Sequence, residues 1–150
     1  MIYQTDFLND GTASADSFYG VNTTPSKAFD NSTSSYWLSD ESAFPHWIKY
    51  DLGVVKRARK LRVYPEELQA KDFKLEGSND DSIWAELLSD AFTSTAEWNE
   101  WTFDNSTAYR YYKITVTSNY TEGGDTYAGI YEIELMEAVT SRTKSNRGFN

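Results

Sequence analysis

The chain has 150 residues, no cysteine and a formal net charge of −9, with 39% hydrophobic and 16% aromatic residues. This length suits one domain with a hydrophobic core, and the lack of cysteine excludes disulfides, thiolate metal sites and a cysteine nucleophile. The acidic balance disfavours nucleic acid phosphates and anionic membranes, and no apolar run is long enough for a transmembrane segment. Cations, neutral sugars and basic protein surfaces remain as partners.

Five segments alternate apolar and polar residues with the period of two that is typical of β-strands. In chain order they are HWIKYDL (46–52), KLRVY (60–64), DFKLEG (72–77), YRYYKITVT (109–117) and GIYEIELM (129–136). Clusters of Gly, Asn, Asp and Ser separate them, and only PEELQAKDF (65–73) has a weak helical pattern. This arrangement predicts an antiparallel β-sandwich or barrel.

The two ends of the chain differ from this pattern. The opening MIYQTDFLNDG has neither a basic nor a long apolar stretch, so we predict no secretory signal there. From residue 139 onward apolar residues become rare, while Arg142, Lys144 and Arg147 occur without acids. We therefore expect one domain over 1–138 and a basic flexible tail or linker over 139–150.

Four Asn-x-Ser/Thr sequons occur, at Asn22, Asn31, Asn105 and Asn119. They would be glycan acceptors in a protein secreted by a eukaryote. Turns rich in Asn, Ser and Thr also create such triplets by chance. Because no signal is predicted, we favour the second interpretation.

Six short segments, taken in order, resemble one protein family. They are TASADSFYG, PSKAFDNSTSSYW, HWIKYDLG, FKLEGSNDDSIW, YRYYKITVT and AGIYEIELME, which together extend from Thr12 to Met136. This series resembles the discoidin domain, also called the coagulation-factor C-type domain, whose bacterial branch is the family 32 carbohydrate-binding modules. The resemblance implies an all-β, antiparallel jelly-roll sandwich of about eight strands. It also implies a non-catalytic protein that recognises ligands through loops at one end.

The resemblance further implies a structural calcium ion that is wrapped by the segment from Lys27 to Trp37 and closed by a glutamate of the last strand. The positions that correspond to ligands are Lys27, Asp30, Ser32, Ser35, Tyr131 and Glu132. Carboxylate, hydroxyl and carbonyl oxygens are the ligands that calcium prefers. Asn31 replaces the usual glycine, and asparagine tolerates a left-handed backbone. The alternative is a turn that bonds to itself without a metal.

Large rings flank this segment and occur elsewhere in the strands. We expect Phe29 and Trp37 to be buried at either end of the loop, and Trp47 and Trp84 to belong to the core.

Sugar sites combine an aromatic platform with polar groups that bind the hydroxyls. In the loops that the family gathers at one end, the candidate rings are Tyr19, Phe44, Tyr64 and Tyr120, and the candidate polar residues are Asp40, Glu41, Glu66, Asn119 and Asp125. Each ring could equally be packed within its own loop. The only histidine, His46, is expected to be structural, and the candidate loops contain no arginine. Specificity for galactose, which relatives achieve with a loop histidine and arginine, is therefore not indicated.

Two functions remain open. The first is a carbohydrate-binding adhesion module that contacts a cell-surface glycan or a polysaccharide. The second is a structural virion component, such as a capsid decoration, head fibre or tail protein, which acts through contacts with other protein domains and with or without host glycans. Both agree with a location outside the cell or on a virion surface. A hydrolase is disfavoured, because the sequence shows neither two opposed carboxylates in a cleft nor a Ser-His-Asp order.

Overall fold

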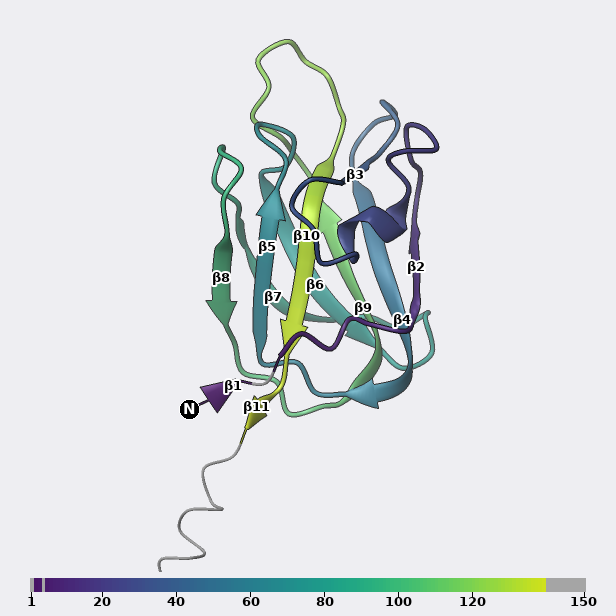
Figure 1. Ribbon diagram of the computed structural model, residues 1–150, viewed down its shortest axis with the longest axis vertical. Coiled ribbons are helices and arrows are strands. Elements are labelled where there is room, and N and C mark those ends of the chain that lie inside the picture. Colours follow the sequence, from purple (N-terminus) through teal and green to yellow (C-terminus); the bar gives the residue numbers. More distant parts are fainter. Residues whose placement is uncertain (1, 4, 140–150) are drawn as a thin grey trace, which may run out of the picture.

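The structure is a computed structural model that describes residues 2–3 and 5–139 (Figure 1). Two antiparallel sheets pack face to face, one with five strands in the order β2-β4-β9-β6-β7 and one with four in the order β3-β10-β5-β8. A separate two-stranded sheet joins β1 to β11. The predicted all-β antiparallel sandwich is therefore confirmed.

The strands have the following bounds. The five-stranded sheet contains β2 (Thr12–Ala15), β4 (His46–Lys56), β9 (Tyr109–Val116), β6 (Asp72–Ser78) and β7 (Ala85–Ala91). The four-stranded sheet contains β3 (Trp37–Leu38), β10 (Gly129–Met136), β5 (Lys60–Pro65) and β8 (Asn99–Thr102). The small sheet contains β1 (Ile2–Tyr3) and β11 (Ala138–Val139).

The five predicted strands correspond to β4, β5, β6, β9 and β10. Residues 65–73, with their weak helical pattern, instead form the end of β5, a turn and the start of β6. Within the described residues the one helical element is η1 (Pro25–Ala28), a single 3-10 turn. No helix in that part of the chain is long and apolar enough to cross a membrane.

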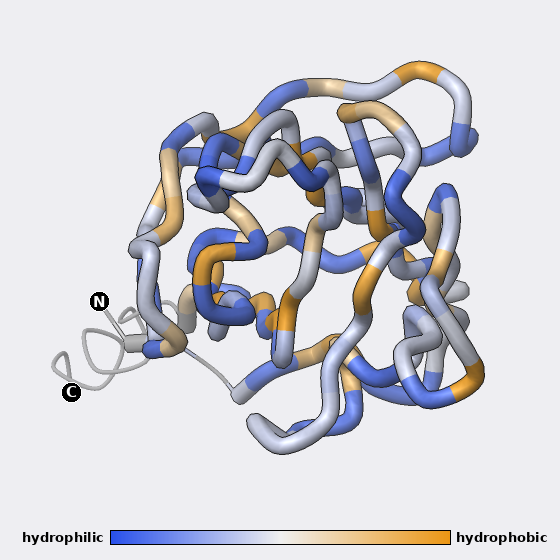
Figure 2. Tube along the Cα trace, turned by 90° about the horizontal axis from the view of Figure 1, so that it is seen from above, coloured by the Kyte–Doolittle hydropathy of each residue, from blue (hydrophilic) through white to orange (hydrophobic). Residues whose placement is uncertain are grey.

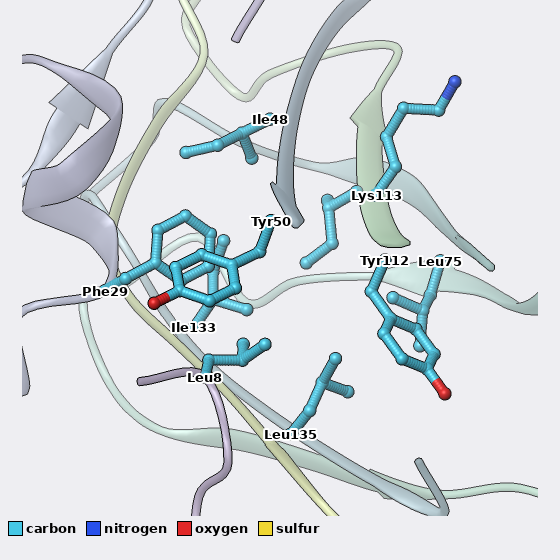
Figure 3. A pocket seen from close by; sticks show the side chains of 10 residues that line it. Leu8, Phe29, Ile48, Tyr50, Leu75, Tyr112, Lys113, Ile133 and Leu135 are labelled. Atoms are coloured by element: carbon cyan, nitrogen blue, oxygen red, sulfur yellow. The ribbon is translucent and has the colours of Figure 1, made fainter. Parts of the chain in front are cut away.

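The core lies between the two sheets, where alternating residues of each strand point inward. Ile48 of β4 and Ile114 of β9 face Val63 of β5 and Leu135 of β10, and all four are almost fully buried. A small cavity of about 10 Å³ remains beside Ile48 (Figure 3). A space of this size holds at most one water molecule, so it is a packing gap and not a ligand site.

Trp47 and Trp84 were expected to belong to the core, but both lie at its outside. Trp47 alternates with the buried Ile48 in β4 and is only half-buried on the outer face, where Lys49 Nζ lies 4.9 Å from its ring centroid. Lys113 Nζ lies 4.1 Å from the centroid of Trp84. These cation–π contacts explain how two tryptophans are accommodated at the surface.

The loops divide between two ends of the sandwich. The β2–η1, β3–β4, β5–β6, β7–β8 and β9–β10 loops lie at one end, at the top of Figure 1, and we call this the loop end. The β1–β11 sheet lies at the opposite end. That sheet includes Val139, while the rest of the predicted tail, 140–150, is outside the described residues.

Candidate cation and ligand sites

The segment predicted to wrap a cation is anchored at both ends by aromatic rings. Trp37 is fully buried, and its Nε1 donates a hydrogen bond of 2.9 Å to the carbonyl oxygen of Ser17. The ring of Phe29 packs against that of Tyr50 with 4.7 Å between centroids (Figure 3). Trp37 is buried as predicted, whereas Phe29 is only half-buried against the core, and the two rings fix where the intervening loop begins and ends.

Between these anchors the loop bonds to itself. Asn31 has φ of +60°, the left-handed geometry that its place after Asp30 suggested. Asp30 Oδ1 accepts the Ser32 backbone N–H at 3.2 Å, and Asp30 Oδ2 accepts the Ser35 hydroxyl. The structure thus brings Asp30 and Ser35 together, as both the metal interpretation and the self-bonded turn require.

Glu132 of β10 lies beneath this loop and is 1% exposed. A register shift between Ile130 and Glu132 leaves Tyr131 without a partner on β5. The Glu132 Oε1 atom accepts the Asn31 N–H at 3.1 Å, whereas Oε2 is buried without a hydrogen-bond partner in the described part of the chain. Burial, together with the nearby Glu134, Asp6 and Asp30 carboxylates, raises the pKa of Glu132 to about 9. A buried carboxylate of this kind needs a cation or a proton.

Asp6 is an acidic neighbour that the sequence analysis did not identify. One carboxylate oxygen from each of Asp6, Glu132 and Glu134 lies within 4.8 Å of the other two. Asp6 comes from the opposite end of the chain, and no spacing in the sequence indicates that it meets β10. The half-buried Lys27 and Ser32 lie on the same loop, where the family resemblance places carbonyl ligands.

At the loop end, three loops meet around Tyr19, Glu41 and Tyr127. Tyr19 is 65% exposed and contacts the Tyr127 ring edge-on, with 5.9 Å between centroids. The Tyr127 hydroxyl lies 3.4 Å from Glu41 Oε1, and the Thr126 hydroxyl donates to the Glu41 carbonyl at 2.8 Å. Seen from above in Figure 2, hydrophobic stretches interrupt the largely hydrophilic loops of this end. Tyr127 was not predicted, because it lies in a polar loop without a strand pattern.

Several other predicted ligand residues make contacts within the protein. The Asn119 amide donates to Asp125 Oδ1 at 3.0 Å and to the Tyr127 carbonyl at 2.9 Å. The Tyr120 hydroxyl donates to the Phe92 carbonyl at 2.7 Å. These contacts stabilise the β9–β10 loop. They occupy polar atoms of Asn119, Asp125 and Tyr120, so fewer of those atoms remain to hydrogen-bond a ligand.

Asp40 and Phe44 differ in their exposure to solvent. Asp40 is exposed, and hydrogen bonds from Ser42 hold the pKa of its carboxyl below the usual range. Phe44 is half-buried and packs against His46 with 5.3 Å between centroids. Asp40 is thus open to a ligand, whereas Phe44 mainly supports the loop.

Tyr64 lies in β5, and Glu66 follows directly after that strand. Tyr64 packs edge-on against Trp98 and Tyr131, with centroid distances of 5.4 and 5.8 Å. Glu66 lies against Gly129, where a Cβ would overlap its Oε1 atom. That oxygen is buried without a hydrogen-bond partner among the described residues, and burial raises the pKa of Glu66 to about 7.

His46 connects three loops of the loop end. Its Nδ1 lies 2.7 Å from Asp16 Oδ2, and its Nε2 lies 3.0 Å from the Ser42 carbonyl and 2.8 Å from the Thr126 carbonyl. The ring is fully buried, so it cannot contact a ligand. Its predicted structural role is thereby confirmed.

The fold is a jelly-roll β-sandwich, and solved family 32 carbohydrate-binding modules have the same fold. The family 32 module of NanJ from Clostridium perfringens, solved with galactose, has a TM-score of 0.78 at 20% identity, covering 91% of this chain and 100% of that one. The CpGH89CBM32-5 module of the same organism, solved with GalNAc-β-1,3-galactose, has a TM-score of 0.77 at 18% identity over 88% and 99%. Chitosan-binding module 2 from Paenibacillus sp. IK-5, solved with chitotriose, has a TM-score of 0.76 at 21% identity over 87% and 98%.

The family follows from the sequence itself. The family model of the F5/8 type C domain matches residues 11–133, so this chain belongs to the F5/8 type C, or discoidin, family. A search of curated proteins found no match.

Proposed function

We propose that this chain is a non-catalytic carbohydrate-binding module that contacts its sugar with the loop end. The observation that carries this proposal is the exposed Tyr19 ring beside the Tyr127 hydroxyl and the Glu41 carboxylate. The apolar face of a pyranose stacks on such a ring, while nearby carboxylates and hydroxyls bind its hydroxyl groups. The sugar complexes of a family 32 module and of a chitosan-binding module that share its fold support the same class of ligand.

The charge of three loops at the loop end limits which sugars can bind there. The loops over 16–24, 39–45 and 117–128 contain acidic residues, among them Asp40, Glu41 and Asp125, but no lysine or arginine. An acidic sugar held by these three loops would meet their acidic side chains and no basic side chain from them, which disfavours its binding. The ligand is therefore a neutral or amino sugar, presented outside a cell or on a surface.

Titration calorimetry with galactose, N-acetylgalactosamine and chitosan oligosaccharides tests this proposal. We expect millimolar or tighter binding of at least one of them, lost in Tyr19→Ala. Val21→Ala is the matched control, because Val21 is 83% exposed in the same loop. Absence of binding to all three, or binding unaffected by Tyr19→Ala, would contradict the proposal.

The same proposal includes a structural calcium ion between the loop and the last strand. Asp30, Ser35 and Glu132 would supply side-chain oxygens, and Lys27, Ser32 and Tyr131 would supply carbonyls. The unpartnered Oε2 of the buried Glu132 supports this assignment, because the donor set consists only of the hard oxygens that calcium prefers. The ion would hold the loop on β10 and take no part in sugar contact.

The alternative of a virion component has no specific observation in its favour. None of the relatives reported above is a virion protein. Detection of the chain in purified virus particles would support this alternative.

A further inference from the structure

The N-terminal segment before β2 is attached to the edge of β10 by backbone contacts. The Phe7 N–H donates to the Leu135 carbonyl at 2.9 Å, and the Leu135 N–H donates to Asp6 Oδ1 at 2.9 Å. Asp6 Oδ1 also accepts the Leu8 N–H at 3.1 Å. One oxygen of Asp6 is therefore fully engaged, and the position of its carboxyl group is fixed.

The other oxygen of Asp6 has no such partner. Asp6 Oδ2 and Glu132 Oε2 are both buried and lack hydrogen-bond partners within the described residues. One oxygen of each carboxylate lies within 4.8 Å of the other and of a Glu134 oxygen. Two buried oxygens without a partner among the described residues, on carboxylates that lie this close together, indicate that a positive charge belongs between them.

Arg62 is the basic group beside this cluster, and it pairs with Glu134 but makes no ion pair with Asp6 or Glu132 among the described residues. Arg62 Nη1 binds Glu134 Oε1 at 2.8 Å, and Arg62 Nε binds Glu100 Oε2 at 2.8 Å. Glu134 is thus already neutralised by a side chain. Asp6 and Glu132 are left without a direct ion-pair partner in the described part of the chain.

We infer that Asp6 supplies a carboxylate ligand to the calcium ion that Glu132 holds, so that the ion ties the N-terminal segment to β10. Two oxygens bound to one calcium at about 2.3–2.6 Å each lie at most about 5 Å apart, and the spacing of this cluster meets that limit. The inference rests on the calcium site proposed above and adds a ligand from outside residues 11–133, the part that matches the family model. The competing explanation is a proton shared between the two carboxyl groups.

Calcium titration of three proteins separates these explanations. Asp6→Asn keeps an oxygen for the Leu8 and Leu135 N–H groups but removes the charge. Asp10→Asn is the matched control, because it removes the same charge from an exposed residue of the same segment. We expect Asp6→Asn to weaken calcium binding at least tenfold in calorimetry and Asp10→Asn to change it less than twofold.

Thermal unfolding adds a second readout. In EDTA, Asp6→Asn should melt no lower than the wild type, because it removes one of two close carboxylates. In saturating calcium it should melt several degrees lower. This reversal distinguishes a lost ligand from general destabilisation. Hydrogen exchange at the Phe7 amide should slow on addition of calcium in the wild type only.

The possible failures can be told apart. Equal calcium affinity of wild type and Asp6→Asn, with binding lost in Asp30→Ala, would overturn the role of Asp6 and leave the loop site intact. A wild type that binds no calcium would overturn both and favour the shared proton. Sugar binding is measured separately and depends on neither result.

Discussion

The backbone N–H of Asn31 donates a hydrogen bond to the buried carboxylate of Glu132, which lies 101 residues further along the chain. This contact joins the loop between Phe29 and Trp37 to the last long strand. Asn31 makes it from a left-handed backbone conformation, with φ of +60°. The loop, the strand and the proposed ion therefore form one unit, and changes in any of them should alter the stability of the others.

Chelation should destabilise the wild type and leave Asp30→Ala nearly unaffected. A ligand at about 100 times its Kd stabilises a protein by about 2.7 kcal/mol, which corresponds to roughly 5–10 °C in Tm for a domain of this size. Scanning calorimetry with calcium and with EDTA measures the difference. Asp104→Ala is the control, because Asp104 is fully exposed in the β8–β9 loop. A full EDTA effect in Asp30→Ala would exclude Asp30 as a ligand.

Asn31→Gly should fold and keep its stability within about 0.5 kcal/mol, because glycine adopts a positive φ without strain. Asn31→Ala should lose about 1–2 kcal/mol, since alanine lacks the short polar side chain that lets asparagine adopt this conformation at lower cost. Urea unfolding measures both variants. Equal stabilities would show that the left-handed geometry is not required.

Stability should depend on pH through Glu66. Burial raises its pKa from 4.5 to about 7, so the folded state binds the proton more tightly than the unfolded state. The resulting stabilisation is fully present below pH 4.5 and is lost as the pH rises through about 7. We expect Glu66→Gln to remove about 2 kcal/mol of this pH dependence in urea unfolding between pH 4.5 and 8. Glu67→Gln, at an exposed neighbour, should leave the dependence unchanged.

His46→Ala should weaken both the fold and the loop end. It removes the group that lies between Asp16, Ser42 and Thr126 and leaves their part-buried acceptor oxygens without this partner, at a cost of about 2–4 kcal/mol. Because Thr126 precedes Tyr127, sugar affinity should fall as well. His46→Gln retains an N–H donor and should recover part of both losses. Unchanged sugar affinity in His46→Ala would show that the ring does not position these loops.

The central strands could be predicted because each has one buried face. In β9, Tyr112, Ile114 and Val116 alternate with less apolar residues and pack on the core. In β7, by contrast, Glu86, Ser89 and Asp90 are exposed and no clear alternation remains. β7 and β8 therefore escaped detection, although backbone pairing with β6 and β5 includes them in the sheets.

The cation loop could be predicted from its residue types and its family resemblance, but its surroundings could not. The burial of Glu132 depends on a register shift in β10 and on a loop lying over it. Asp6 reaches the same place because the backbone of Phe7 pairs with Leu135 and the Asp6 carboxylate accepts the Leu135 N–H, and no local pattern encodes these contacts. Tyr127 reaches Tyr19 only because three loops converge.

The pairing of Ile2 with Val139 places the first and last described strands side by side, at the pole away from Tyr19 and Glu41 (Figure 1). A peptide tag or surface linker joined to either strand would therefore be attached at the end of the sandwich opposite the loop end. Immobilised by such a linker, the domain would direct its acidic tip toward the solution. In that arrangement the position of the β1–β11 pair would set the orientation of the loop end toward the proposed sugar.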